Sequence, residues 1–153
     1  MPIDQDAALA SDPSRADLEA IADLWVASWA EIMPHIDFVA RRDWLLARLA
    51  VWPVTIFLKD DGALLGFATF DPASGCLDQI AVASTAFGTG VGLRLLQAVK
   101  AACPKGVHLD VNTDNHRAIS FYRREGFIET GEGTNPNSGL KTISMNWNPE
   151  PPR

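Results

Sequence analysis

Apolar residues recur with helical spacing in several parts of the chain. The first such part begins after Pro13 at a capping-box pattern, Ser14–Asp17, and predicts a helix that ends at Pro34. The apolar face of this helix is formed by Leu18, Ile21, Trp25 and Trp29. Similar spacing predicts further helices over residues 37–50, over the segment that follows the glycines at 88–92, and over residues 115–125.

Runs of β-branched, aromatic and other apolar residues predict strands. The runs lie at residues 7–10, 54–59, 63–70, 76–83, 107–111, 127–130 and 140–147. The second and third flank the turn Asp60–Gly62 and predict a β-hairpin, and the fourth is expected to be their antiparallel neighbour. A loop rich in Gly, Asn and Pro, residues 131–139, joins the last two. The pattern as a whole predicts an α+β fold with a mixed sheet.

Length and charge narrow the class of protein. The 153 residues are expected to form a single domain over residues 1–148, with a disordered tail at 149–153. The formal net charge of −6 argues against a general nucleic-acid binder, which needs a basic face. We find no apolar run of membrane length and no charged-then-apolar leader, so we expect no membrane partner and a cytoplasmic location.

The cysteines and histidines carry no sign of a metal site. Cys76 and Cys103 lie far apart in apolar contexts, which favours buried reduced thiols over a disulfide. His35, His108 and His116 are scattered and lack the spacing of metal ligands. We therefore predict that the protein binds no metal.

Three alternating glycines, Gly88, Gly90 and Gly92, lie between an apolar strand and a helix. Glycine adopts left-handed backbone angles, and a helix N-terminus presents unpaired N–H groups that favour an anion such as phosphate. The spacing differs from a P-loop and from the Gly-x-Gly-x-x-Gly dinucleotide loop. Asp110 imitates the ribose-binding acid of the latter, but the glycines here follow antiparallel strands, so we disfavour nicotinamide redox chemistry.

A second pattern follows in residues 112–127, which read Asn-x-x-Asn-x-x-Ala-x-x-Phe-Tyr-x-x-x-Gly-Phe. With the glycine loop, this makes the segment from Cys76 to Phe127 similar to the core of the GNAT superfamily of acyl-CoA-dependent N-acyltransferases. The family's pyrophosphate motif is Gln/Arg-x-x-Gly-x-Gly/Ala, and Gly90-Val91-Gly92 matches its glycine half. Phe87 stands at the Gln/Arg position, so the phosphates would rely on backbone N–H groups alone or on Arg94.

The resemblance implies a GNAT-like fold with a central mixed β-sheet of six to seven strands and about four helices. The sheet splays apart at a cleft for acetyl-CoA, between the strands at 76–83 and 107–111. The positions that match the family's cofactor site are Ile80, Ala81, Val82, Phe87, Gly88, Thr89, Gly90, Val91, Gly92, Asn115 and Phe121.

The resemblance also implies direct acetyl transfer from acetyl-CoA to an amine. Tyr122, the only tyrosine, occupies the family's general-acid position, and a phenol stays protonated at neutral pH, so it can donate to the CoA thiolate. Asp78 is our candidate for the base, although Gln79 lies beside it on the strand and only one of them can face the cleft. Glu31 and Asp37 compete for the role, and deprotonation through water needs none of them.

The acceptor site is expected on the N-terminal helices and the 131–139 loop. We expect Trp29, Glu31, Met33 and Phe38 to bind the acceptor, with Trp25 nearby. Aromatic rings with carboxylates beside them would suit a small cationic amine. The acceptor is thus expected to be a primary amine of a small molecule or peptide, and the chain could form a homodimer. The alternative is a non-catalytic acyl-CoA-binding or regulatory module on the same fold.

Overall fold

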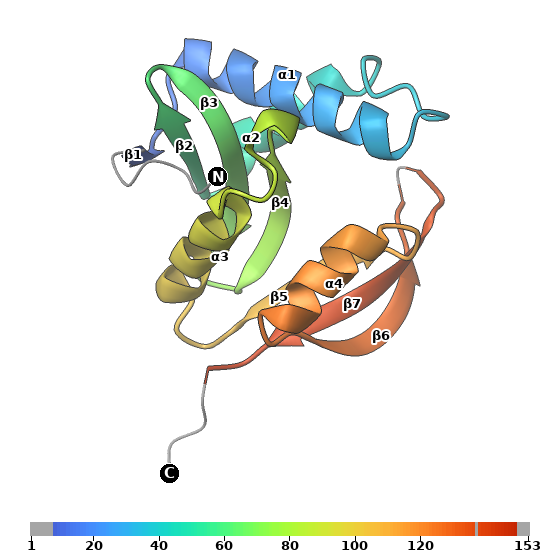
Figure 1. The fold of residues 1–153 in the computed structure, drawn as a ribbon. Coiled ribbons are helices and arrows are strands. Elements are labelled where there is room, and N and C mark those ends of the chain that lie inside the picture. Colours follow the sequence, from blue (N-terminus) through green and yellow to red (C-terminus); the bar gives the residue numbers. More distant parts are fainter. Residues whose placement is uncertain (1–7, 137, 150–153) are drawn as a thin grey trace.

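The computed structural model describes residues 8–136 and 138–149 (Figure 1). Most of the expected tail, residues 150–153, lies outside the described residues, as does Ala7 of the expected opening strand. The elements in chain order are β1 (Ala8–Ser11), α1 (Arg15–Ile32), α2 (Arg42–Val51), β2 (Val54–Asp60), β3 (Ala63–Asp71), β4 (Cys76–Val82), a 3₁₀ turn η1 (Ser84–Ala86), α3 (Val91–Ala102), β5 (Val107–Asn112), α4 (His116–Arg124), β6 (Ile128–Thr134) and β7 (Lys141–Trp147).

The strands form one seven-stranded mixed sheet in the order β1-β2-β3-β4-β5-β7-β6. Strands β1 to β4 are antiparallel neighbours, and so are β5, β7 and β6. The two groups are joined by the only parallel pair among the described strands, β4 and β5. The α+β fold with a mixed sheet is confirmed.

The parallel pair holds at one end and then separates. Its register contains one pair, Cys76 with His108, beside which the His108 amide donates to the Gly75 carbonyl at 2.9 Å. Beyond this point β4 and β5 diverge, which opens the two halves of the molecule like a V (Figure 1). Gly75 lies at the apex with φ +80°, and a Cβ there would lie 2.4 Å from the Gly106 carbonyl oxygen. Only glycine fits so close an approach.

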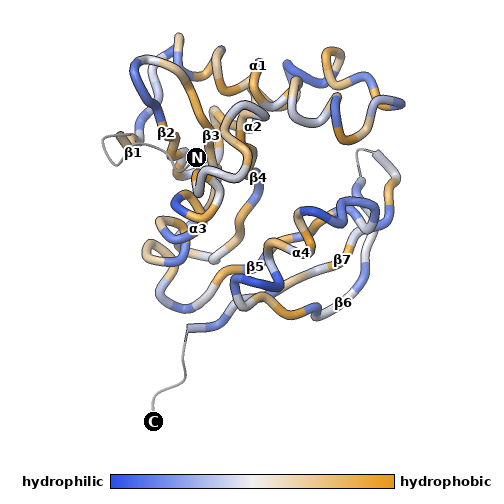
Figure 2. The backbone as a smooth tube through the Cα atoms, in the orientation of Figure 1, coloured by the Kyte–Doolittle hydropathy of each residue, from blue (hydrophilic) through white to orange (hydrophobic). Residues whose placement is uncertain are grey.

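Each face of the β1–β4 half is covered by helices. On one face the cross-strand set Phe57, Phe67 and Ala81 packs with the apolar sides of α1 and α2. On the other face Ile56, Ala68 and their neighbours pack against α3. Apolar residues recur along α1, α3 and the central strands (Figure 2). The alternation of strand side chains therefore places apolar residues on both faces of the sheet.

A β-bulge interrupts this alternation in β4. Thr69 of β3 pairs with Gln79, whereas the next residue, Phe70, pairs with Leu77, so Asp78 is passed over. The extra residue reverses the phase of the strand: Gln79 and Ala81 share one face, and Leu77 packs into the cluster on the other. Bulges of this kind are frequent next to active sites, because they redirect side chains.

Two predicted boundaries were wrong. The second helix begins at Arg42 rather than at residue 37, because residues 37–41 form turns in which the Asp37 carboxylate accepts from the Ala40 amide at 3.1 Å. The strand predicted to end at Thr130 continues to Thr134, which shortens the loop to residues 135–140. Glycines at 131 and 133 suggested a loop, but their backbones pair with β7.

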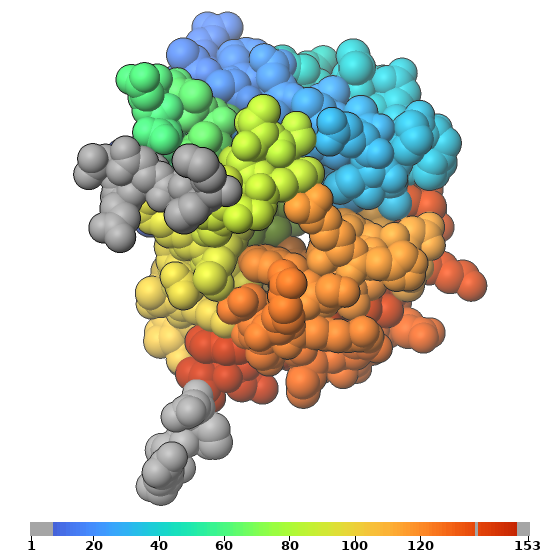
Figure 3. All heavy atoms as spheres, viewed as in Figure 1, coloured from blue at the N-terminus to red at the C-terminus, as the bar shows by residue number. Residues whose placement is uncertain are grey.

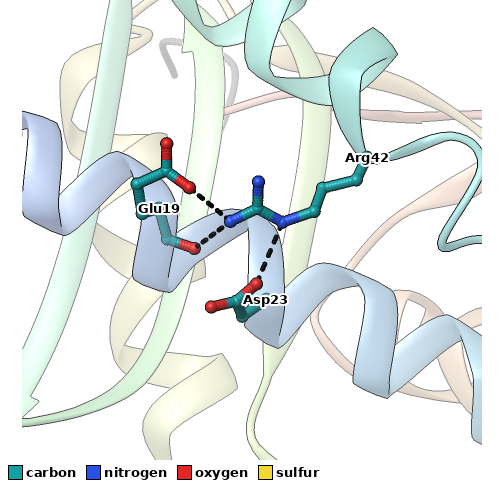
Figure 4. A network of polar contacts seen from close by, with 3 residues as sticks. All are labelled: Glu19, Asp23 and Arg42. Atoms are coloured by element: carbon teal, nitrogen blue, oxygen red, sulfur yellow. Dashed lines mark hydrogen bonds and ion pairs between the residues drawn. The ribbon is translucent and has the colours of Figure 1, made fainter.

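An ion-pair network fastens α2 to α1. The Arg42 guanidinium donates to Asp23 at 2.9 Å and to the carboxylate of Glu19 at 2.5 Å (Figure 4). A third bond reaches the Glu19 carbonyl at 3.2 Å. Exposed pairs of this kind contribute little to stability, because water and salt screen the charges. Their main effect is geometric, because they fix the position of one helix relative to the other.

Candidate active site

The glycine loop forms the N-terminus of α3. Gly88 and Gly90 have φ values of +76° and +91°, and Gly90 is the N-cap. Within the described residues, the amides of five consecutive or nearly consecutive positions have no hydrogen-bond acceptor: Gly88, Gly90, Val91, Gly92 and Leu93. Such a group of amides at the positive end of a helix dipole is suited to a phosphate group.

A cleft of about 890 Å³ runs from this loop along β4 to α4 and β5. In Figure 3 the surface is hollowed between the yellow-green segment before α3 and the orange surface of α4. Ten of the eleven predicted cofactor positions line the cleft: Ile80, Ala81, Val82, Phe87, Gly88, Gly90, Val91, Gly92, Asn115 and Phe121. Thr89 does not, because its hydroxyl and its amide both turn back to the Ala86 carbonyl.

An arginine from α4 stands beside the loop. The guanidinium carbon of Arg117 lies 3.8 Å from the centroid of the Phe87 ring, and both residues line the cleft. Across the described residues, Arg117 makes no ion pair or hydrogen bond. Arg94 does not line the cleft. The cation next to the unpaired amides is therefore Arg117, not Arg94, and no sequence pattern indicated that contact.

Asn115 holds the start of α4. It is 8% exposed and lines the cleft, and its side-chain oxygen accepts from the Ala118 amide at 3.2 Å as the helix N-cap. This fixes the helix that carries the next cleft residues, Arg117, Phe121 and Tyr122.

Tyr122 projects from the same helix into the lining of the cleft. Its ring packs between Phe121 and Phe127, with centroid distances of 5.5 and 5.4 Å. Burial raises the pKa of the Tyr122 phenol well above its usual range. Its hydroxyl makes no hydrogen bond to any described residue. A phenol that is protonated, held by its ring and free at its oxygen can serve as a proton donor.

Asp78 also lines the cleft, but its carboxylate is engaged. Both oxygens accept from Arg48, each at 2.6 Å, and the Asp78 side chain is only 10% exposed. The Arg48 guanidinium lies in turn over the rings of Trp44 and Trp52, at 5.2 and 5.3 Å. Both oxygens of the Asp78 carboxylate are therefore engaged by one guanidinium in a bidentate pair. The arrangement argues against the role of base that the sequence suggested.

Gln79 faces the other way from Asp78, toward α1. Its side-chain oxygen accepts from the Trp25 indole N–H at 3.0 Å. Gln79 lines the large cleft and a second cavity as well. It therefore orients Trp25 at the wall between them.

The second cavity has a volume of about 340 Å³, and we call it the acceptor pocket. Trp29, Met33 and Phe38, which the sequence suggested for the acceptor, line this cavity, and so does Trp25. Its other lining residues are Ile36, Ala40, Arg41, Trp44, Gln79, Asn112, Asn135, Ser138 and Leu140. Five of these thirteen residues also line the large cleft, so the two cavities meet at a common wall formed by Trp29, Trp44, Gln79, Asn112 and Asn135.

Glu31 is not part of either cavity. Glu31 lies exposed in the last turn of α1. Asp37 is likewise exposed, and its carboxylate accepts from the Ala40 amide in the turn before α2. Neither acidic residue lines a cavity of the described structure, and a role for either at the acceptor site stays a prediction. Helical phase explains Glu31, because the buried side of α1 carries Ile21, Ala22 and Trp25.

We also searched the described residues for metal sites, reactive thiols and membrane-spanning helices. No group of three or more His, Cys, Asp or Glu residues could hold a metal ion. Cys76 and Cys103 are free thiols, as predicted, and burial raises the pKa of Cys76 to about 11. Among the described helices, none combines the length and the apolar character that crossing a membrane requires.

Comparison with known proteins decides the family. The family model described as acetyltransferase (GNAT) family matches residues 18–127. This chain belongs to that family. It is an acyl-CoA-dependent N-acetyltransferase, and acetyl-CoA is its cosubstrate. A curated relative, the peptidyl-lysine N-acetyltransferase YiaC of Escherichia coli K12, is 29% identical, with 89% of this chain and 94% of that protein covered.

Solved structures of GNAT proteins share the fold. A GCN5-related N-acetyltransferase from Rhodopseudomonas palustris superposes with a TM-score of 0.79 at 19% identity, covering 97% of this chain and 99% of that one. The acetyltransferase yncA from Salmonella typhimurium, solved with its cofactor acetyl-CoA, gives a TM-score of 0.65 at 16% identity and covers 97% of each chain. The GNAT-like fold expected from the sequence is thus confirmed.

Proposed function

We propose that this GNAT protein transfers an acetyl group directly from acetyl-CoA to a primary amine of a small molecule or peptide, with Tyr122 as general acid. The observation that carries the proposal is the meeting of two cavities. The large cleft is lined by the residues of the unpaired amides and by Tyr122, and the acceptor pocket adjoins it along five shared lining residues. An acyl donor in one cavity and an amine in the other would meet there.

The large cleft supports a phosphate-bearing donor. The five unpaired amides of the glycine loop suit a pyrophosphate, and Arg117 adds a positive charge beside them. Beyond Cys76, β4 has no register with β5, so its backbone groups on that side are available to an extended ligand. The amide-bearing arm of CoA is such a ligand, and it would pair like an added strand.

The chemical step needs a neutral amine, stabilisation of the oxyanion and a proton for the thiolate. The amine nitrogen attacks the thioester carbonyl, the C–N bond forms, and the tetrahedral oxyanion is held by backbone N–H groups of β4. The nitrogen, now bearing an extra proton, releases it to water, the C–S bond breaks, and the thiolate takes the proton of the Tyr122 hydroxyl. The phenolate of Tyr122 recovers a proton from the solvent in the cleft.

The amine loses its proton to water rather than to Asp78. The carboxylate of Asp78 is committed to Arg48, and Glu31 and Asp37 lie outside both cavities. The fraction of acceptor that is already neutral therefore limits the rate at low pH. A primary amine has a pKa near 10, so the rate is expected to rise with pH across the neutral range.

Two measurements test the proposal together. Calorimetry with acetyl-CoA reports binding, and a thiol-release assay over a panel of amines, including a lysine peptide like the substrate named for the relative YiaC, reports transfer. Binding accompanied by thiol release that depends on an amine supports the enzyme. Tight binding without release on any amine would instead favour the non-catalytic acyl-CoA-binding module.

A further inference from the structure

One charged side chain lies in the acceptor pocket. Arg41 is the only ionisable residue among those that line it, counted over the described residues. Its guanidinium carbon lies 5.9 Å from the centroid of Phe38, and it makes no ion pair with a described residue. Arg41 is also the N-cap of α2, where the helix dipole has the same positive sign. The pocket is therefore positive.

No carboxylate balances this charge among the described residues of the pocket. Glu31 and Asp37 are exposed outside it, and Asp78 lies in the other cavity, paired with Arg48. A polycationic acceptor would be repelled by Arg41 and would find no acidic partner there. An acceptor with an anionic group would instead pair with the Arg41 guanidinium, which has no anionic partner among the described residues.

The other residues that line the acceptor pocket indicate the size and the chemical character of the rest of the acceptor molecule. They are mostly apolar and aromatic, and the volume of about 340 Å³ is at the small end of the range of ligand pockets. Arg41 and Trp44 are three residues apart and so lie on one side of the helix, and Trp44 belongs to the wall shared with the large cleft. A carboxylate at Arg41 would therefore leave an amine a few bonds away close to the junction of the cavities.

We infer that the acceptor is a free α-amino acid with an aromatic or large apolar side chain. Its carboxylate binds Arg41, its side chain fills the apolar pocket, and its α-amine faces the thioester. This inference rests on the proposed function, because it names the substrate class of the same site.

The test compares amino acids with the same molecules lacking the carboxylate. The pairs are L-phenylalanine with phenethylamine, L-tryptophan with tryptamine, and L-methionine with 3-(methylthio)propylamine. Values of kcat/KM are measured by thiol release for the wild type, Arg41→Gln and Arg41→Lys. Arg123→Gln is the matched control, because it removes an exposed arginine that lines neither cavity.

We expect the wild type to prefer at least one amino acid over its partner by about tenfold to a hundredfold, the value of one charge-assisted hydrogen-bonded contact. Arg41→Gln should abolish the preference, Arg41→Lys should keep part of it, and Arg123→Gln should keep all of it. Equal or faster turnover of the decarboxylated amines, or of an N-terminally blocked lysine peptide, would overturn the inference while leaving the proposed function intact.

Absence of thiol release with every amine would count against the proposed function. In that case calorimetry of L-phenylalanine on the CoA-loaded protein, repeated with the other two amino acids, decides the inference by itself. Binding that Arg41→Gln removes supports it, and absence of binding by any of the three amino acids overturns it.

Discussion

The guanidinium of Arg117 lies over the ring of Phe87 at 3.8 Å, which joins the first residue of the glycine loop to the first turn of α4. Phe87 occupies a position at which the family motif has Gln or Arg. The stacked arginine restores a positive charge at the same corner of the cleft.

Replacing Arg117 by Ala is expected to weaken acetyl-CoA binding about threefold to thirtyfold, because a partly exposed charge–phosphate contact is lost. Calorimetry at two salt concentrations measures the loss, which should shrink at high salt. Arg94→Ala is the matched control, since Arg94 does not line the cleft. Equal weakening by both variants would mean that only the net charge of the protein matters.

Phe87→Ala is expected to weaken binding as well, although Phe87 carries no charge, because Arg117 loses the ring on which it rests. A double-mutant cycle with Arg117→Ala measures this dependence. The double variant should bind acetyl-CoA nearly as well as Arg117→Ala alone. Fully additive losses would show that the two residues act separately.

Tyr122→Phe is expected to lower kcat by about 10²–10⁴ while leaving the Kd for acetyl-CoA unchanged, because only the proton donor is removed. Since burial raises the pKa of Tyr122, the phenol stays protonated at neutral and mildly alkaline pH. The wild-type kcat should therefore show no alkaline decline from this residue below about pH 10. Unchanged turnover in the variant would remove Tyr122 from the mechanism.

Asp78→Asn and Arg48→Gln are expected to have similar effects, because each breaks the same ion pair. Each should lower the free energy of unfolding by about 1–2 kcal/mol, and the double variant should lose little more than either single one. Urea denaturation gives the three values. If Asp78→Asn alone abolished turnover while Arg48→Gln retained it, Asp78 would be the base after all.

Asp17 links α1 to the sheet in a pH-dependent way. Its carboxylate accepts from Lys59 and from the Ser14 amide, and these bonds lower its pKa from 3.8 to about 2. The folded state therefore holds the proton more weakly than the unfolded state, so stability rises with pH between about 2 and 4. Asp17→Asn should lower Tm at neutral pH, and the difference from the wild type should fade as the pH falls through this window.

The elements that the sequence predicts well are those determined by residues close to one another in the sequence. The helix of Leu18, Ile21 and Trp25 and the hairpin around Asp61 follow from spacing and turn chemistry, since both are determined by near neighbours. Strand β6 was underestimated because all its residues are exposed, which leaves no apolar alternation to recognise.

In the candidate site, too, features that depend on neighbouring residues could be predicted from the sequence, whereas contacts between distant segments could not. Backbone positions of the glycine loop could be assigned from a motif, because the motif is continuous in sequence. The contacts of Phe87 with Arg117, of Asp78 with Arg48, and of Gln79 with Trp25 join distant segments. Side-chain pairing between elements depends on their packing, so the true surroundings of Asp78 and the place of Glu31 required the structure.

The two cavities that meet at the shared wall are formed mostly by different segments of the chain. The unpaired amides and the cation beside them come from residues 87–93 and from α4, whereas most of the residues that line the acceptor pocket come from residues 25–44 and 135–140. Substitutions at Arg41, Ile36 or Leu140 can therefore alter which amine is accepted without touching the donor side. Proteins that evolve from this fold can therefore change the amine that they accept by substitutions in the acceptor pocket, while the residues of the large cleft stay the same.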